Sequence, residues 1–429
     1  MSTKLMRVLG REQWRSGFYK TLISVISVVF GGLSLYSALN LLEVHAQGVS
    51  QVSKTKLGDS KSDAEYSWRL FVQAVSPSGN PQRPLAFETW QEQCDLQPAL
   101  CGLPANSDSA SVLTTSGASP AETSKTRPRR GHGSALARSR INAGHNDVNV
   151  SCSAMNTTGF PPIAFATNVT PKAVFCEEIF VNQTEAGFIL ANRLTTISGQ
   201  QAYGNITFPT KSIEIKVDWV PQSSFTTPFS CDDPSLYIET IAFEGQPKQC
   251  YAMVGMHISS KVLPNWLWAT FEPNNLLTNP NRCNPMLYGE CEDTWGTTSA
   301  KPYGPGATPA QSPELAKVMR DFKLPAAFNN YFLTGVQTEF VKQGKATQLG
   351  NSFVEFNAGV SPQQASCITC HAYAYAGIEK QFIGGPLPGW PNIGYACKQA
   401  GATKNCLPTK SASGKLSSED FSWMLGIMP

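Results

Sequence analysis

The residue types with the clearest chemical potential lie near the C-terminus, in residues 366–371, which read SCITCH. Cys367 and Cys370 are three positions apart, so on a helix their thiols point to one side. From there both can form thioether bonds to the vinyl groups of one porphyrin. The imidazole of His371, which follows directly, can then ligate the iron. Because Cys-x-x-Cys-His is the attachment signature of a c-type haem, the sequence predicts one covalently bound haem c.

Two other uses of Cys367 and Cys370 have to be compared with haem attachment. The pair could form a disulfide or a redox dithiol, or it could supply half of a zinc site. A zinc site needs further ligands, and only Cys397 and Cys406 follow, at a spacing that is not typical of zinc sites. A dithiol has no need of the adjacent His371. Haem attachment therefore accounts for more of the motif than either alternative.

The second axial position of the iron decides the chemistry, and three assignments remain open. His257 lies in an apolar, strand-like stretch, VGMHI, where a lone histidine is more often structural. Met424 and Met428 near the C-terminus are the other candidates, and the third assignment is an open iron. Methionine ligation raises the reduction potential and bis-histidine ligation lowers it; both suit electron transfer, whereas an open iron binds peroxide or O₂. The candidate haem-binding residues are Cys367, Cys370, His371 and His257, with His371 and His257 as iron ligands.

The N-terminus has the pattern of an export signal. Residues 1–20 are basic, residues 21–42 are apolar, and Val44-His45-Ala46 offers a small-x-small cleavage site. The apolar run is also long enough to span a bilayer, so an uncleaved anchor is the alternative. In both cases we expect the body to be exported, either periplasmic or secreted, with contact to the inner membrane only if residues 21–42 are retained.

Net charge and cysteine usage agree with export. The formal net charge is +3, and the basic residues of the first 46 positions account for it, which argues against nucleic acid as a partner. Without the two haem cysteines, ten of the 12 cysteines remain, an even number that favours disulfides in an oxidising compartment. The expected pairs are Cys94–Cys101, Cys152–Cys176, Cys231–Cys250, Cys283–Cys291 and Cys397–Cys406.

The chain is expected to fold as an α+β protein, with an antiparallel β core, peripheral helices and a C-terminal haem c segment packed on the core. Residues 105–147 are rich in Ser, Ala, Thr, Gly and Pro and carry a basic cluster, which indicates a solvated loop, or alternatively a docking site for an acidic redox partner. The expected segments are 1–46 (signal peptide or anchor), 47–104 (helical), 105–147 (basic loop), 148–345 (β-rich body) and 346–429 (haem c-binding).

Three local patterns predict individual elements. A helix is expected to begin at Ser62, where Ser62 and Glu65 could form a capping box, with an apolar stripe that continues to Val75. Strict alternation in residues 213–219 predicts a half-buried strand, and residues 148–275 as a whole are predicted to be antiparallel β. Ser312 and Pro313 are expected to cap and open a further helix.

Several stretches together resemble a family of exported bacterial proteins, the cytochrome c family or cytochrome c domain-containing proteins. They are WRLF (68–71), FETW (87–90), IEIKVDW (213–219), VGMHI (254–258), WLWATFE (266–272), LGNS (349–352), SCITCHA (366–372) and DFSW (420–423). The resemblance implies a secreted or periplasmic single-haem protein and favours a role for His257. It implies no particular reaction.

Two functions are compatible with these patterns. The first is an electron carrier that serves an unidentified redox partner protein, because the chain carries no second cofactor signature. The second is a haem enzyme of peroxidase-like type, because the chain is much longer than a carrier needs and His257 could serve as a distal acid or base. A binding or sensory module that uses haem as a reporter is a third interpretation.

Overall fold

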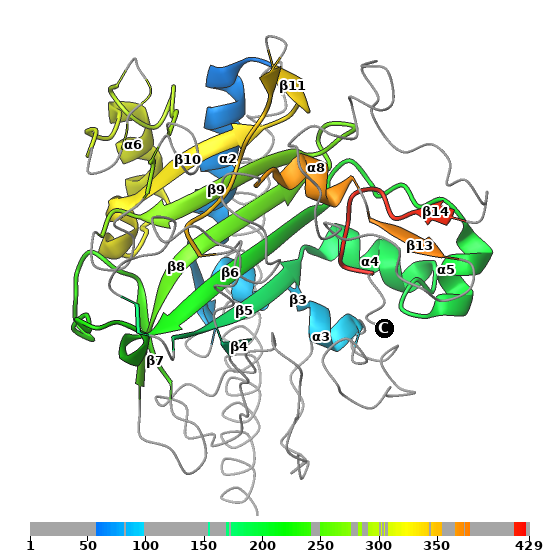
Figure 1. Ribbon diagram of the computed structural model, residues 1–429, viewed down its shortest axis with the longest axis horizontal. Coiled ribbons are helices and arrows are strands. Elements are labelled where there is room, and N and C mark those ends of the chain that lie inside the picture. Colours follow the sequence, from blue (N-terminus) through cyan, green and yellow to red (C-terminus); the bar gives the residue numbers. More distant parts are fainter. Residues whose placement is uncertain are drawn as a thin grey trace, which may run out of the picture. The chain divides into compact units, whose positions relative to one another are not determined.

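The protein, represented by a computed structural model, has an α+β fold built on one antiparallel sheet (Figure 1). The structure describes residues 57–80, 83–97, 153–154, 169–170, 173–241, 249–275, 282–284, 291–299, 302, 304, 308–342, 345–353, 365–372, 374–377 and 416–425. The sheet has eight strands in the order β10-β9-β8-β6-β5-β3, with β7 added to β8 and β4 to β5.

The strands and helices have the following bounds. The sheet strands are β3 (Gln91–Glu92), β4 (Ser153–Ala154), β5 (Val174–Val181), β6 (Ile213–Pro221), β7 (Ile238–Ile241), β8 (Gln249–Ser260), β9 (Leu267–Pro273) and β10 (Tyr331–Gln337). The small ladders are β1 (Pro77–Asn80) with β2 (Arg83–Leu85), β11 (Val341–Lys342) with β12 (Lys345–Ala346), and β13 (Tyr375–Gly377) with β14 (Leu416–Ser418). The α-helices are α2 (Ser60–Ala74), α3 (Gln93–Leu96), α4 (Gln183–Ala191), α5 (Ile197–Tyr203), α6 (Pro313–Asp321) and α8 (Cys367–His371).

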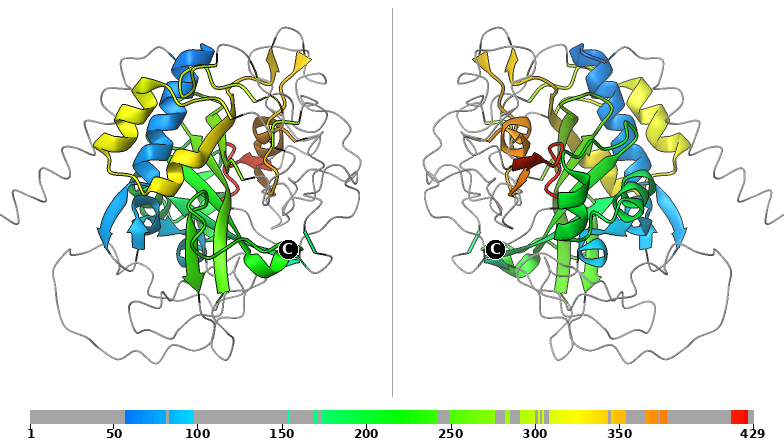
Figure 2. Two further views of the ribbon diagram at one scale, coloured as in Figure 1. Left: turned by 90° about the vertical axis from the view of Figure 1, so that its left-hand side faces the viewer. Right: turned by 90° about the vertical axis from the view of Figure 1, so that its right-hand side faces the viewer.

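The two faces of the sheet are covered differently. Helices α2 and α6 lie on one face, and α8 and β14 lie on the other (Figure 2). On the α2 face, the rings of Phe71 and Phe271 stack with their centroids 4.3 Å apart, and Trp68 meets Phe271 edge-on at 5.0 Å. This aromatic contact forms an apolar core, as the stripe in the sequence predicts.

Helix α2 begins two residues earlier than expected. Asp59, not Ser62, is the N-cap: its carboxylate accepts hydrogen bonds from the backbone N–H of Ser62 at 3.0 Å and from the Ser62 hydroxyl at 2.8 Å. Glu65 forms an ion pair with Arg69 at 2.7 Å instead of completing a capping box. An ionised carboxylate is the stronger acceptor at a helix N-terminus, so Asp59 displaces the cap predicted at Ser62. Ser312 and Pro313 cap and open α6 as predicted.

The prediction that β6 is half-buried is wrong. Every residue of β6 is buried except Lys216, which is partly exposed. Alternation in the sequence arises because one face is apolar and packs toward α2, while the other face is polar and lies beneath the C-terminal segment. The buried polar residues of this face, on β5, β6, β8 and β9, are Glu177, Glu214, Asp218, Ser259, Thr270 and Glu272. We call this surface the buried polar face.

The β-rich region also contains two helices that the strand prediction for residues 148–275 missed. Asn182 ends β5 and caps α4, because its side-chain oxygen accepts the backbone N–H of Glu185 at 3.1 Å. Thr196 caps α5 in the same way, by accepting the N–H of Gly199 at 3.1 Å. Both are ordinary N-cap residues, so the local signal for these helices was present in the sequence.

Two of the expected disulfides, Cys231–Cys250 and Cys283–Cys291, are present. Cys176 is also disulfide-bonded. The pairs Cys94–Cys101, Cys152–Cys176 and Cys397–Cys406 each involve a cysteine outside the described residues. Residues 1–46 and 105–147 lie outside them too, and within the described part no helix is long and apolar enough to cross a membrane.

Candidate functional site

The Cys-x-x-Cys-His motif forms a single helical turn, α8, over the buried polar face. Cys367 is buried, Cys370 is partly exposed, and both are thiols. The turn is closed by hydrogen bonds from the Cys370 N–H to the Ser366 carbonyl at 2.9 Å and from the Ala372 N–H to the Ile368 carbonyl at 3.0 Å. The structure therefore gives the motif the helical conformation that the spacing of its thiols requires.

Gln337, the last residue of β10, holds the N-terminus of α8. Its Oε1 accepts the backbone N–H of Ile368 at 2.9 Å, and its Nε2 donates to the Ser366 hydroxyl at 2.8 Å. Ser366 makes no side-chain cap of its own, so Gln337 satisfies a donor that would otherwise be orphaned. No sequence signal marks Gln337, because its partner is distant along the chain.

His371 is fixed by a backbone carbonyl and an aromatic ring. Its Nδ1 lies 2.8 Å from the carbonyl oxygen of Phe421, and its ring centroid lies 4.3 Å from that of Trp268. A carbonyl can only accept, so the proton resides on Nδ1 and Nε2 keeps its lone pair for a metal. Burial and the nearby Lys216 charge lower the pKa of His371 to about 3, although the Phe421 hydrogen bond opposes the shift. The ring is therefore neutral, the form that ligates a metal.

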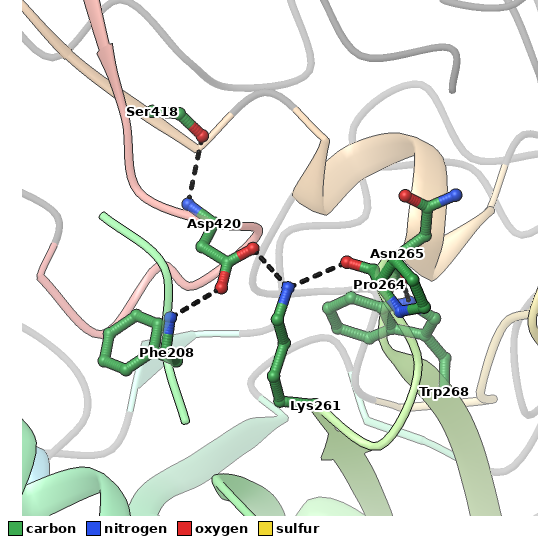
Figure 3. A network of polar contacts seen from close by, with 7 residues as sticks. All are labelled: Phe208, Lys261, Pro264, Asn265, Trp268, Ser418 and Asp420. Atoms are coloured by element: carbon green, nitrogen blue, oxygen red, sulfur yellow. Dashed lines mark hydrogen bonds and ion pairs between the residues drawn. The ribbon is translucent and has the colours of Figure 1, made fainter. Parts of the chain in front are cut away.

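The carbonyl of Phe421 is presented by an unusual turn. Asp420 and Phe421 both have left-handed backbones, with φ of 53° and 70°. This conformation costs about 1–2 kcal/mol for a residue with a side chain, so other contacts must hold it. The Asp420 carboxylate accepts Lys261 Nζ at 2.5 Å and the Phe208 N–H at 2.7 Å, which ties the turn to the body (Figure 3).

His257, on β8, lies beside the first cysteine of the motif. Its Nδ1 is 3.9 Å from the Cys367 sulfur, and its cross-strand neighbours are Lys216 and Thr270. Burial lowers the pKa of His257 well below its usual value, and Lys216 and His371 lower it further. The structure thus brings His257, Cys367 and His371 to the same region.

Met424 also lies near the motif. It is buried in one apolar cluster with Trp268, Cys367, Ile368 and Phe421. Met428 lies outside the described residues. Of the candidate axial ligands, His257 and Met424 are therefore both placed close to α8.

The loop after β12, residues 347–353, lies between the motif and the sheet. Asn351 donates to the Thr270 hydroxyl at 2.9 Å, and a Cβ at Gly255 would come within 2.7 Å of the Asn351 side-chain oxygen. Gly255 is therefore needed for this close approach. The same loop brings the Leu349 carbonyl to 3.6 Å from the Cys367 sulfur.

A cavity of about 580 Å³ lies next to the motif without containing it. Gln337 and Leu349 belong to its wall, but none of Cys367, Cys370, His371 and His257 is among its lining residues. Its charged lining residues are Asp63, Glu272, Glu292, Glu339 and Lys342. The cavity therefore offers no substrate site in contact with His371.

The described residues are compatible with a covalently held haem. The two thiols share one helical turn, and His371 presents a neutral nitrogen with its other nitrogen already bonded. Within the described part of the chain, no group of three or more His, Cys, Asp or Glu residues is arranged to hold a metal ion. Cys397 and Cys406, the further ligands considered for zinc, lie outside it.

Comparisons with known proteins add no assignment: no family model, no curated protein and no solved structure matches the chain.

Replacing Gln337 by alanine should loosen α8. The Ile368 N–H then loses its acceptor inside the protein, at a cost of about 1–3 kcal/mol. We expect faster amide hydrogen exchange in a peptide that covers residues 366–372. Gln311→Ala is the matched control, because Gln311 bonds the Asn329 carbonyl instead. Unchanged exchange in Gln337→Ala would contradict this role.

Glu419, in the turn that presents Phe421, predicts a pH dependence of stability. Burial raises its pKa from 4.5 to about 8. The folded state therefore keeps a proton that the unfolded state releases, and this contribution to stability is lost as pH rises from about 4.5 to 8. We expect urea unfolding of Glu419→Gln to show a smaller loss of stability over that range than the original chain. An identical pH profile in the two proteins would show that folding does not raise the pKa of Glu419.

Proposed function

We propose that this chain is an exported single-haem c-type cytochrome that transfers electrons to or from a redox partner protein. The observation that carries the proposal is the pairing of two thiols on one helical turn with a partly buried, neutral His371 whose Nδ1 is bonded to the Phe421 carbonyl. Export rests on the sequence pattern of residues 1–46.

Each residue has a distinct part in this proposal. Cys367 and Cys370 would hold the haem through thioether bonds, and His371 would ligate the iron through Nε2. When bound, the haem supplies one-electron exchange between ferric and ferrous iron. Trp268 packs against His371 and restricts rotation of its ring, while Phe421 fixes the position of its proton.

An electron carrier agrees with the site better than the peroxidase-like alternative. A haem enzyme needs a cavity in which a small substrate reaches the iron. The cavity beside α8 is lined by none of the candidate haem residues, and both His257 and Met424 lie close enough to the motif to be considered as second ligands. Among the described residues, no observation specifically favours the enzyme.

The proposal is tested by producing the full chain in a host that attaches haem c and recording its spectrum after denaturation in alkaline pyridine. We expect the bands of covalent haem in the original chain and their loss in Cys367→Ala/Cys370→Ala, because no thioether bond can form. Cys283→Ser/Cys291→Ser, which removes a disulfide elsewhere, should retain them. Absence of haem bands from the original chain would refute the proposal.

The axial ligand is tested by comparing His257→Ala with Met424→Leu. A carrier has a six-coordinate, low-spin iron, so we expect one of the two substitutions to convert the absorption spectrum to high spin. Met256→Leu is the control, because Met256 precedes His257 on β8 and points to the other face of the sheet. A high-spin original chain that reacts rapidly with peroxide would instead support the enzyme.

A further inference from the structure

Two glutamates meet at the end of the buried polar face. Glu214 is the second residue of β6 and pairs across the sheet with Val181 of β5. Glu185 lies in the first turn of α4, which starts directly after β5 and is joined to the start of β6 by a hydrogen bond from the Asn182 N–H to the Ile213 carbonyl at 3.0 Å. Glu185 is completely buried and Glu214 is 7% exposed.

These two carboxyls have almost no donors from the rest of the chain. Within the described residues, neither oxygen of Glu185 nor Oε1 of Glu214 has a hydrogen-bond partner when both groups are ionised. The two side chains are, however, close enough to hydrogen-bond each other, which requires one carboxyl to carry a proton. Two buried carboxyls that share a site do not both ionise near neutral pH. The pair therefore holds one proton.

The charges around the pair keep that proton in place. Burial and the Glu214 carboxyl raise the pKa of Glu185 well above its usual value, and Asp420 adds to the shift. Asp420 is itself paired with Lys261, and the Ser422 hydroxyl bonds Glu214. On the same face of β6, two residues on, Lys216 is paired with Glu177 at 2.6 Å.

The pair is connected to the candidate haem site through one short segment. Asp420 and Ser422, which face the pair, are the chain neighbours of Phe421, and the Phe421 carbonyl accepts the Nδ1 proton of His371. Figure 3 shows Asp420 bonded to Lys261 and to the Phe208 backbone, with the Trp268 ring nearby. A change of charge at the haem would therefore act on the pair across a buried region, where charges are weakly screened.

We propose that Glu185 and Glu214 form a redox-linked proton site: the two carboxyls share one proton in the oxidised protein, take up a second proton from solvent when the haem is reduced, and release it when the haem is oxidised. This inference rests on the proposed function. The electron comes from an external one-electron donor, so each reduction adds one electron at the haem and one proton at the pair. Reduction lowers the positive charge at the haem, which raises the affinity of the pair for the second proton.

A bound cation is the competing use of these carboxyls. Asp420 already has Lys261 as its counter-ion, which leaves two carboxyls, and the described residues contain no metal-binding group of three. The geometry therefore favours a proton over a metal ion.

The test is a spectroelectrochemical titration of the full-length exported haem protein at a series of pH values. The pKa of the pair is lower in the oxidised protein than in the reduced protein. Between these two pKa values, we expect the midpoint potential to fall as pH rises. Glu185→Gln and Glu214→Gln, which cannot exchange a proton at the substituted side chain, should each flatten this dependence. Glu178→Gln is the matched control, because Glu178 is a buried glutamate on the other face of the sheet, bonded to the Trp219 indole.

The outcomes separate this inference from the proposed function. If the protein lacks covalent haem, the proposed function fails, and no potential can be measured. If haem is present but the potential does not vary with pH, or varies as strongly in Glu185→Gln and Glu214→Gln as in the original chain, the redox-linked proton site is refuted. A potential that shifts with added calcium at constant pH would show a cation site instead. Should either variant fold poorly, an infrared redox-difference spectrum of the original chain must show a protonated-carboxyl band, and its absence would also refute the site.

Discussion

The hydrogen bond between His371 Nδ1 and the Phe421 carbonyl is the contact on which the arrangement of the site depends. It joins two segments that are distant in sequence, and it determines which nitrogen of His371 keeps its lone pair. The carbonyl points at His371 because Asp420 and Phe421 adopt left-handed backbones. That conformation is unfavourable on its own. The Asp420–Lys261 ion pair attaches the turn to the body and so helps to hold the turn in this conformation.

The second constraint is a sheet with two buried faces of different chemistry. The α2 face is aromatic and apolar and makes the usual core. The other face is polar, and the C-terminal segment covers it. Burial of polar groups costs free energy unless they are paired, which explains the dense bonding of Asn351 and Gln337 across this layer. The same need for pairing explains why side chains from β9 and β10, Trp268 and Gln337, hold the motif.

The same layer connects the proposed electron-transfer role to the proposed proton site. Glu214 and Lys216 lie on one face of β6, and Lys216 is the cross-strand neighbour of His257. The polar face thus runs from the carboxyl pair to the region of the haem motif. Electron and proton would then be coupled through charges in a medium of low dielectric constant, without a direct bond between the two sites.

The sequence by itself determined the elements whose signals are local. It predicted the helical turn of the motif from the spacing of Cys367 and Cys370, the apolar stripe of α2, the Ser312–Pro313 start of α6 and the short-range disulfide Cys283–Cys291. It also predicted the α+β class and named His257, which lies beside Cys367. The tertiary structure alone decided the burial of the polar side of β6, the cap of α8 by Gln337, the Phe421 carbonyl at His371 and the meeting of Glu185 with Glu214. These contacts join residues far apart in the chain, and alternation of polar residues looks the same whether that face meets water or a covering segment.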